Sequence, residues 1–227
     1  MFKNLKIIGT SHISKQSMLD LNIAFEEFRP DIITVELDKR RYFSLMSTQN
    51  SSSAKGPSIL SVGISGYLFL SLGKFLQKKL GSIVGIEPGS DMKEAINLAK
   101  NNNCELALID RDIQLTLKSF SKNFSFRDKL SFFKDLFLGW TSKRRINIDL
   151  TKVPKDEFID KILDEIKIRY PGIYNSLIHE RNVFMAKKLF VLMRNNPDKK
   201  ILCVVGAGHK KGLEAYLKHL FYSNISF

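Results

Sequence analysis

The sequence predicts an α/β protein in which a central, largely parallel sheet is flanked by helices. The β-prone runs Leu5–Ile8 and Ile32–Val35 have the composition of buried strands. Residues 14–28 lie between them and carry apolar side chains at helical spacing. A strand, a helix and a strand in this order imply a right-handed crossover and parallel strands. The 227 residues, with 44% hydrophobic and 26% charged side chains, suit one folded domain over residues 1–227.

The rest of the chain alternates between strand-like and helix-like segments. Strands are expected at 83–86, 106–109 and 201–205, and short helices at 38–46, 92–100 and 213–220. Between the last two strands, from about 113 to 195, the pattern predicts a mostly helical insertion that is broken near 147–154 and at Pro171-Gly172. A turn through Gly206–Gly208 is expected to separate the last strand from the last helix.

Charge and cysteine content limit the classes of function. The net charge is +13, from 36 Lys plus Arg against 23 Asp plus Glu, but the basic residues are scattered in pairs and triplets. We therefore do not favour nucleic acid as a partner. Cys104 and Cys203 have no CxxC spacing and form no disulfide framework, and the first residues lack the apolar core of a signal peptide. These features favour a cytoplasmic location.

An uncharged segment from Gly56 to Gly73 has about the length of a membrane span. It contains a proline, four serines and four glycines, and it continues into a basic stretch that ends at Lys79. We favour a buried or interface helix here, with a homodimer formed through the Gly56–Lys79 region, because an exposed apolar surface favours association. Contact with a membrane surface is the less favoured alternative.

Two predicted strands are followed by the same short pattern. Gly9-Thr10-Ser11-His12 follows the first strand, and Gly206-Ala207-Gly208-His209 follows the last. A glycine permits a sharp turn off a strand, and ligands of open α/β sheets bind beyond the carboxyl ends of the strands. We therefore expect His12 and His209 at that edge. Two histidines in matching contexts are better candidates than one, since a single histidine after a strand is usually a surface residue.

Carboxylates follow the other predicted strands and are expected at the same edge. Glu36 and Asp38 follow the strand at 32–35, Glu87 follows that at 83–86, and Asp110 follows that at 106–109. Imidazole and carboxylate groups suit a divalent metal such as Mn, Co or Zn, which lowers the pKa of a water to about 7. The structural alternatives are a salt bridge between Glu36 and an arginine, and an ion pair within Asp110-Arg111.

Several blocks of the sequence together resemble the TraB/PrgY family, which includes the TIKI proteins. They are Gly9–Ser17, Arg29–Tyr42, Glu87–Met92, Ile109–Ile113, Glu180–Asn182 and Val205–His209, and they run in order along nearly the whole chain. The resemblance implies a fold related to the erythromycin-esterase and ChaN-like group. It also implies metal-dependent peptide cleavage, with His12, His209 and Glu36 at the metal.

The hypothesis of a metal-dependent hydrolase gives roles to neighbouring residues as well. Glu36 is expected as a ligand or catalytic carboxylate, and Arg111 and Arg181 as further catalytic residues. Asp110, Glu180, Glu87 and Asp38 are expected to orient the metal ligands or to contact substrate. The sequence thus predicts a metal-dependent peptidase that acts on small peptides or exposed peptide segments. The alternative is a non-catalytic module that binds and sequesters peptides, as in pheromone shutdown.

Overall fold

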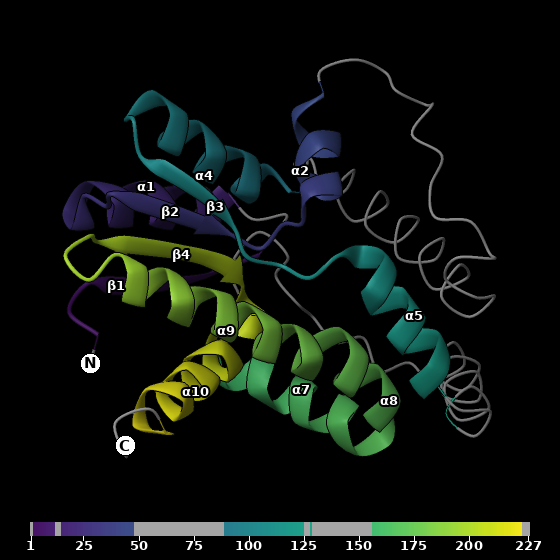
Figure 1. Cartoon of the computed structure of the whole chain (residues 1–227). Coiled ribbons are helices and arrows are strands. Elements are labelled where there is room, and N and C mark those ends of the chain that lie inside the picture. Colours follow the sequence, from purple (N-terminus) through teal and green to yellow (C-terminus); the bar gives the residue numbers. More distant parts are fainter. Residues whose placement is uncertain (1, 12–14, 48–88, 125–127, 129–155, 224–227) are drawn as a thin grey trace.

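A four-stranded parallel sheet forms the centre of the molecule, in a computed structural model that describes residues 2–11, 15–47, 89–124, 128 and 156–223 (Figure 1). The strand order is β1-β4-β2-β3, so the first and last strands are neighbours. The prediction of a parallel sheet flanked by helices is confirmed. The strands are β1 (Leu5–Thr10), β2 (Ile32–Val35), β3 (Glu105–Leu108) and β4 (Ile201–Gly206).

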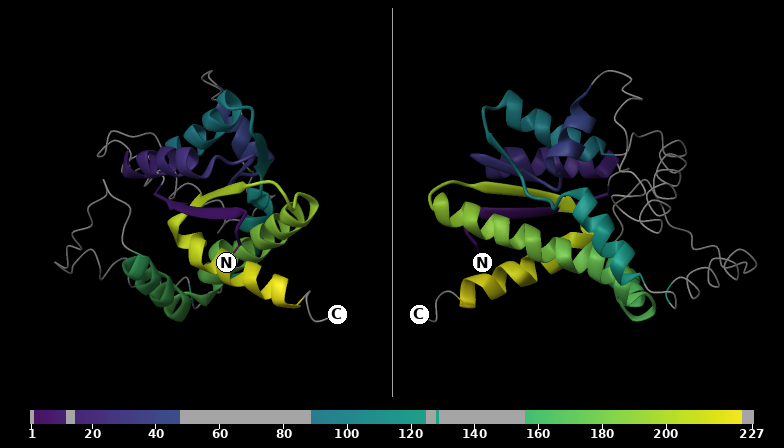
Figure 2. Two further views of the ribbon diagram at one scale, coloured as in Figure 1. Left: turned by 90° about the vertical axis from the view of Figure 1, so that its left-hand side faces the viewer. Right: turned by 45° about the vertical axis from the view of Figure 1, so that its right-hand side comes forward.

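The two inner strands are buried on both faces because helices cover both sides of the sheet (Figures 1 and 2). Leu202 and Val204 of β4 pack with α1 (Lys15–Phe28) and α4 (Ser90–Asn101) on one side. Cys203 and Val205 pack on the other side with α9 (Glu180–Asn195) and α10 (Ala207–Ser223). This alternation follows from the two-residue period of a strand and gives the sheet two apolar cores.

The remaining helices lie mostly beyond the carboxyl ends of the strands, where Figure 1 shows α5 and α8. Pro171 is the first residue of α8, so the predicted helix break coincides with a new helix start. None of the helices within the described ranges is long and apolar enough to cross a membrane. These elements are α2 (Lys39–Met46), α5 (Ile113–Asn123), α7 (Asp156–Arg169), α8 (Pro171–Tyr174) and the π-helix η1 (Asn175–His179).

Two local predictions about the glycines were wrong. Gly9 and Gly206 are the fifth and last residues of their strands rather than turn residues, and Gly9 brings β1 close to α10. An added Cβ at Gly9 would lie 3.1 Å from Cα of Ala207. The last helix begins at Ala207 instead of near Leu213, so His209 belongs to its first turn. Gly9 therefore serves close packing, and neither glycine reverses the backbone.

The sequence predictions for residues 56–79, including the proposed dimer surface, lie outside the described residues. The same holds for the predicted strand at 83–86 and for Glu87 and His12.

Candidate functional site

Three buried polar side chains meet at the carboxyl edge of the sheet. Glu36 follows β2 directly, Asp110 lies just after β3, and His209 lies in the first turn of α10 after β4. Their relative exposures are only 2%, 3% and 5%. Because β2 lies between β3 and β4, the strand order brings the three side chains together from distant parts of the sequence.

Arg181 of α9 joins all three groups through one guanidinium. It donates to Asp110 from Nε and Nη2, at 3.1 and 2.7 Å, and it donates to Glu36 from Nη2. Its Nη1 lies 2.9 Å from Nε2 of His209. Arg41 of α2 adds a second cation, 2.9 Å from Oδ2 of Asp110. Glu36, Asp110 and His209 are thus held in one buried cluster, which we call the Arg181 cluster.

The electrostatic balance of the Arg181 cluster keeps its arginine charged. Burial alone lowers the pKa of Arg181, but the charges of Glu36 and Asp110 and their hydrogen bonds outweigh burial and raise it above its ordinary range. Glu36 and Asp110 contribute two negative charges, and Arg41 and Arg181 contribute two positive charges. A buried site with this balance avoids the large cost of an unpaired ion.

The hydrogen bonds of His209 define its tautomer. Arginine has no acceptor, so Nε2 of His209 must accept from Arg181. The proton then lies on Nδ1, which donates to Oδ1 of Asn182 at 2.7 Å. The ring is therefore neutral, with an Nε2 lone pair directed into the Arg181 cluster, and this is the state in which histidine binds a metal.

Glu36 has two differently occupied oxygens. Oε2 accepts from the backbone N–H of Gly206 at 2.6 Å, which fixes the carboxylate against the end of β4. Oε1 lies 3.4 Å from Nε2 of His209. Two ligands that share one tetrahedral ion at about 2.1 Å are separated by about 3.4 Å. The spacing and chemistry of these two donors therefore fit one divalent cation, although the Arg181 guanidinium contacts the same two atoms.

The comparisons with known proteins agree with the resemblance of the motifs. The family model described as TraB/PrgY/gumN matches residues 3–223. The chain belongs to the TraB/PrgY/gumN family. It is 37% identical, over 97% of its length, to an uncharacterized protein of Methanocaldococcus jannaschii, and 23% identical, over 92%, to the TraB domain-containing proteins of Homo sapiens and Mus musculus. It spans 55% of the archaeal relative and 61% of each mammalian one.

Two predicted site residues of this TraB/PrgY/gumN chain form a second ion pair beside the cluster. Arg111 donates to Glu180, while their sequence neighbours Asp110 and Arg181 pair with each other. The segments Asp110-Arg111 and Glu180-Arg181 are thus joined by two crossed ion pairs. The alternative prediction, an ion pair between Asp110 and Arg111, is wrong, because each pairs with a residue of α9 instead. Glu180 and Arg181 are also half-buried, rather than part of a solvated helix face.

Asp38 holds secondary structure in place. Oδ1 of Asp38 accepts from the backbone N–H groups of Arg40 and Arg41, at 2.7 and 3.0 Å, and so caps α2. Its Oδ2 accepts from the N–H of Ile113 at 3.3 Å, at the start of α5. Asp38 therefore positions Arg41 for its contact with Asp110. This geometry is that of a supporting residue.

Three residues of the site were not among the predicted site residues. Asn182 orients His209, Arg41 pairs with Asp110, and buried Asp91 accepts from Oγ1 of Thr10 at 2.5 Å. Thr10 is the last residue of β1. The carboxylate of Asp91 therefore lies at the carboxyl end of β1, which is two residues before His12 in the sequence. A signal for all three was present, since Asn182, Arg41 and Asp91 stand in the sequence blocks that carry the family resemblance.

The described residues alone do not complete a metal centre or supply a cysteine nucleophile. Among them, no group of three or more His, Cys, Asp and Glu side chains is arranged to hold a metal ion. Burial raises the pKa of the Cys203 thiol to about 12, and burial with the charge of Asp31 raises the pKa of Cys104. Neither thiol has the lowered pKa of a reactive cysteine.

Proposed function

We propose that this chain is a divalent-metal-dependent hydrolase that cleaves peptides at the Arg181 cluster. The 3.4 Å separation of Glu36 Oε1 and His209 Nε2 carries the proposal, because it suits two ligands of one ion. His12, which the family resemblance implies as a third ligand, follows a strand that pairs with β4 from Leu5↔Ile201 to Thr10↔Gly206. When bound, a Mn, Co or Zn ion supplies Lewis acidity and an acidified water.

The residues of the chain have separate roles in this proposal. Glu36 and His209 hold the cation, and Asn182 keeps His209 in the metal-binding tautomer. For a cation to be held there, Arg181 would release Oε1 of Glu36 and Nε2 of His209, to which it donates in the structure. The guanidinium would then be free to stabilise the negative charge that develops on the carbonyl oxygen of the scissile bond. Asp110 keeps the guanidinium in place through its two hydrogen bonds.

A test of peptide cleavage uses two histidines on the same helix. The protein is incubated with a peptide library and Mn²⁺, Co²⁺ or Zn²⁺, and products are identified by mass spectrometry. We expect metal-dependent cleavage that falls by about 100-fold or more in His209→Ala, because a metal ligand is lost. His219→Ala removes an exposed imidazole of α10 and serves as the matched control. Absence of metal-dependent products, or equal cleavage by both variants, would contradict the proposal.

A second candidate function is peptide binding without cleavage. The observation in its favour is that Arg181 already donates to Oε1 of Glu36 and Nε2 of His209, as in a structural ion pair. This candidate predicts that peptides bind with the same affinity in the presence of EDTA and of Mn²⁺, and that no product forms. Cleavage that requires a metal would exclude it.

A further inference from the structure

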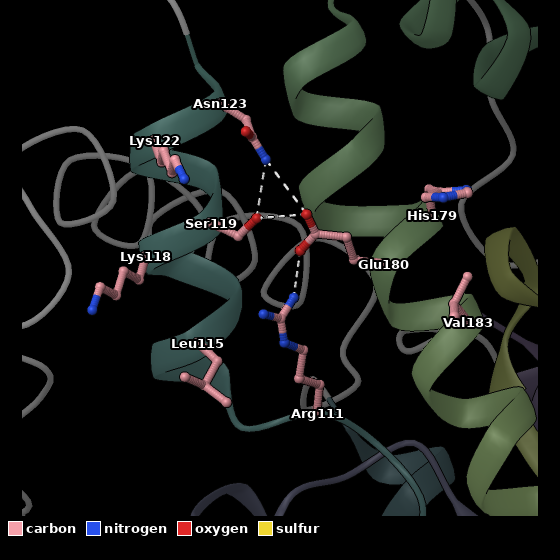
Figure 3. Close-up of a pocket in the computed structure, with 9 residues that line it drawn as sticks. All are labelled: Arg111, Leu115, Lys118, Ser119, Lys122, Asn123, His179, Glu180 and Val183. Carbon is pink, nitrogen blue, oxygen red and sulfur yellow. Dashed lines mark hydrogen bonds and ion pairs between the residues drawn. The ribbon is translucent and has the colours of Figure 1, made fainter.

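A cavity of about 510 Å³ lies beside the Arg181 cluster, between α5 and the junction of η1 with α9 (Figure 3). Its volume falls within the range of about 300–1,000 Å³ that is usual for ligand sites. One wall is formed by Leu115, Lys118 and Lys122 of α5, and the other includes Val183 of α9. A π-helix such as η1 occurs frequently at functional sites. The cavity therefore has the size and setting of a binding pocket.

Glu180 is the one carboxylate among the described lining residues, and protein donors already occupy it. Figure 3 shows Arg111, Ser119 and Asn123 converging on Glu180. Arg111 donates to Oε2 of Glu180, and Ser119 and Asn123 donate to Oε1 at 2.8 and 3.5 Å. Asn175 of the π-helix adds a fourth donor at 3.3 Å. Glu180 thus offsets the charge of Arg111 and offers little to a ligand.

Cationic groups outnumber carboxylates among the described residues that line the cavity. These are Arg111, Lys118 and Lys122 against Glu180, an excess of two positive charges within the described part of the chain. In the part of the chain that the structure describes, no carboxylate lies within 4.0 Å of either lysine ammonium, and Lys118 points away from Glu180 (Figure 3). Arg111 is 22% exposed and uses only Nη1 for its ion pair, so further guanidinium donors remain available to a ligand.

The cavity and the Arg181 cluster are built from neighbouring residues of the same two chain segments. Arg111 of the cavity follows Asp110 of the cluster, and Glu180 of the cavity precedes Arg181 of the cluster. Consecutive Cα atoms are about 3.8 Å apart. An extended peptide spans about 3.3 Å per residue, so a peptide held in the cavity by a carboxylate reaches toward the cluster within a few residues.

We infer that this cavity binds a carboxylate of a peptide substrate and so directs a nearby peptide bond toward the Arg181 cluster. The inference rests on the proposed peptide hydrolysis and adds a preference among substrates. Arg111 forms hydrogen bonds to the carboxylate, Lys118 and Lys122 contribute charge, and Leu115 and Val183 contact its aliphatic part. The carboxylate belongs either to the C-terminus of a peptide or to an acidic side chain.

Peptide binding tests this inference without any need for cleavage. Fluorescein-labelled hexapeptides are compared by anisotropy in four forms: with a free C-terminus, with a C-terminal amide, with a Glu side chain, and with Gln in its place. We expect the full-length protein to bind at least one carboxylate form about tenfold more tightly than its neutral counterpart, as for charge-assisted hydrogen bonds. The amide and Gln forms show which of the two carboxylates is recognised.

Two double variants with the same net charge separate the cavity from general attraction to a basic protein. The double substitution Lys118→Ala with Lys122→Ala should reduce the preference for the carboxylate peptide over its neutral counterpart to about twofold or less. Lys93→Ala with Lys187→Ala removes two exposed lysines elsewhere and should leave it intact. No preference in the unmodified protein, or an equal loss in both double variants, would overturn the inference. A preserved preference without any cleavage would instead contradict the proposed hydrolysis alone.

Discussion

Arg181 is the residue on which the buried cluster depends. Its guanidinium contacts Glu36, Asp110 and His209, and its side chain is 15% exposed. Arg41 also neutralises part of the negative charge of Asp110, whereas the arginine that pairs with Glu36 is Arg181. Removal of this one cation therefore leaves buried negative charge without its partner.

We predict that Arg181→Ala lowers the free energy of unfolding by about 3–5 kcal/mol, the cost of breaking a buried ion pair from one side. Urea unfolding at neutral pH measures it. Arg169→Ala is the control, because the Arg169–Glu165 pair is exposed and such pairs contribute about 0–1 kcal/mol. Equal effects of the two substitutions would show that Arg181 is not the centre of a buried network.

The sequence could predict that Glu36 needs a partner, but not which one. A carboxylate directly after a buried strand is costly unless it is paired, and an arginine was one of the expected partners. The arginine that pairs with it lies 145 positions further along the chain. The contact of Asn182 with His209 was missed because it depends on how α9 packs against α10.

At the scale of elements, the glycines of α10 show how its contact with α9 fixes the site. Gly212 lies against the side chain of Asn182, and an added Cβ would overlap with Nδ2 of that residue. Gly208, in the first turn of the same helix, has more room, since its added Cβ would be 3.9 Å from Leu163. The two glycines thus differ in packing while both lie in a helix.

We predict opposite effects for alanine at these two positions. Gly208→Ala should raise the free energy of unfolding by about 0.5–1 kcal/mol, because alanine is the better helix former. Gly212→Ala should lower it by about 1–3 kcal/mol, because Asn182 must move from an overpacked position. Urea unfolding of both variants provides the measurement. Stabilisation by both substitutions would mean that Gly212 is not needed for the approach of α9 to α10.

Apolar periodicity predicted the described elements closely, and it failed where tertiary packing decides. The strand at 32–35 agrees with β2, and the expected helix at 14–28 agrees with α1 to within a residue. The last helix was expected to begin six residues too late, because Gly206 and Gly208 have low helix propensity and suggest a turn. Packing against β1 and α9 overrides that propensity.

At the scale of the whole molecule, the order of strands creates the site. The sequence indicated parallel strands but not that β4 lies between β1 and β2, since strand order depends on contacts between distant segments. This order places the end of β4, which His209 follows, between the ends of β1 and β2. The proposed metal site and the adjoining cavity thus both depend on long-range packing.

The most direct test of shared metal binding by Glu36 and His209 is an anomalous difference map from crystals of the protein grown with Zn²⁺. We predict a single peak in the Arg181 cluster, about 2.0–2.2 Å from both Oε1 of Glu36 and Nε2 of His209, with Arg181 no longer hydrogen-bonded to Nε2. A map that shows Arg181 still bound to both atoms, with no peak between them, would contradict the account.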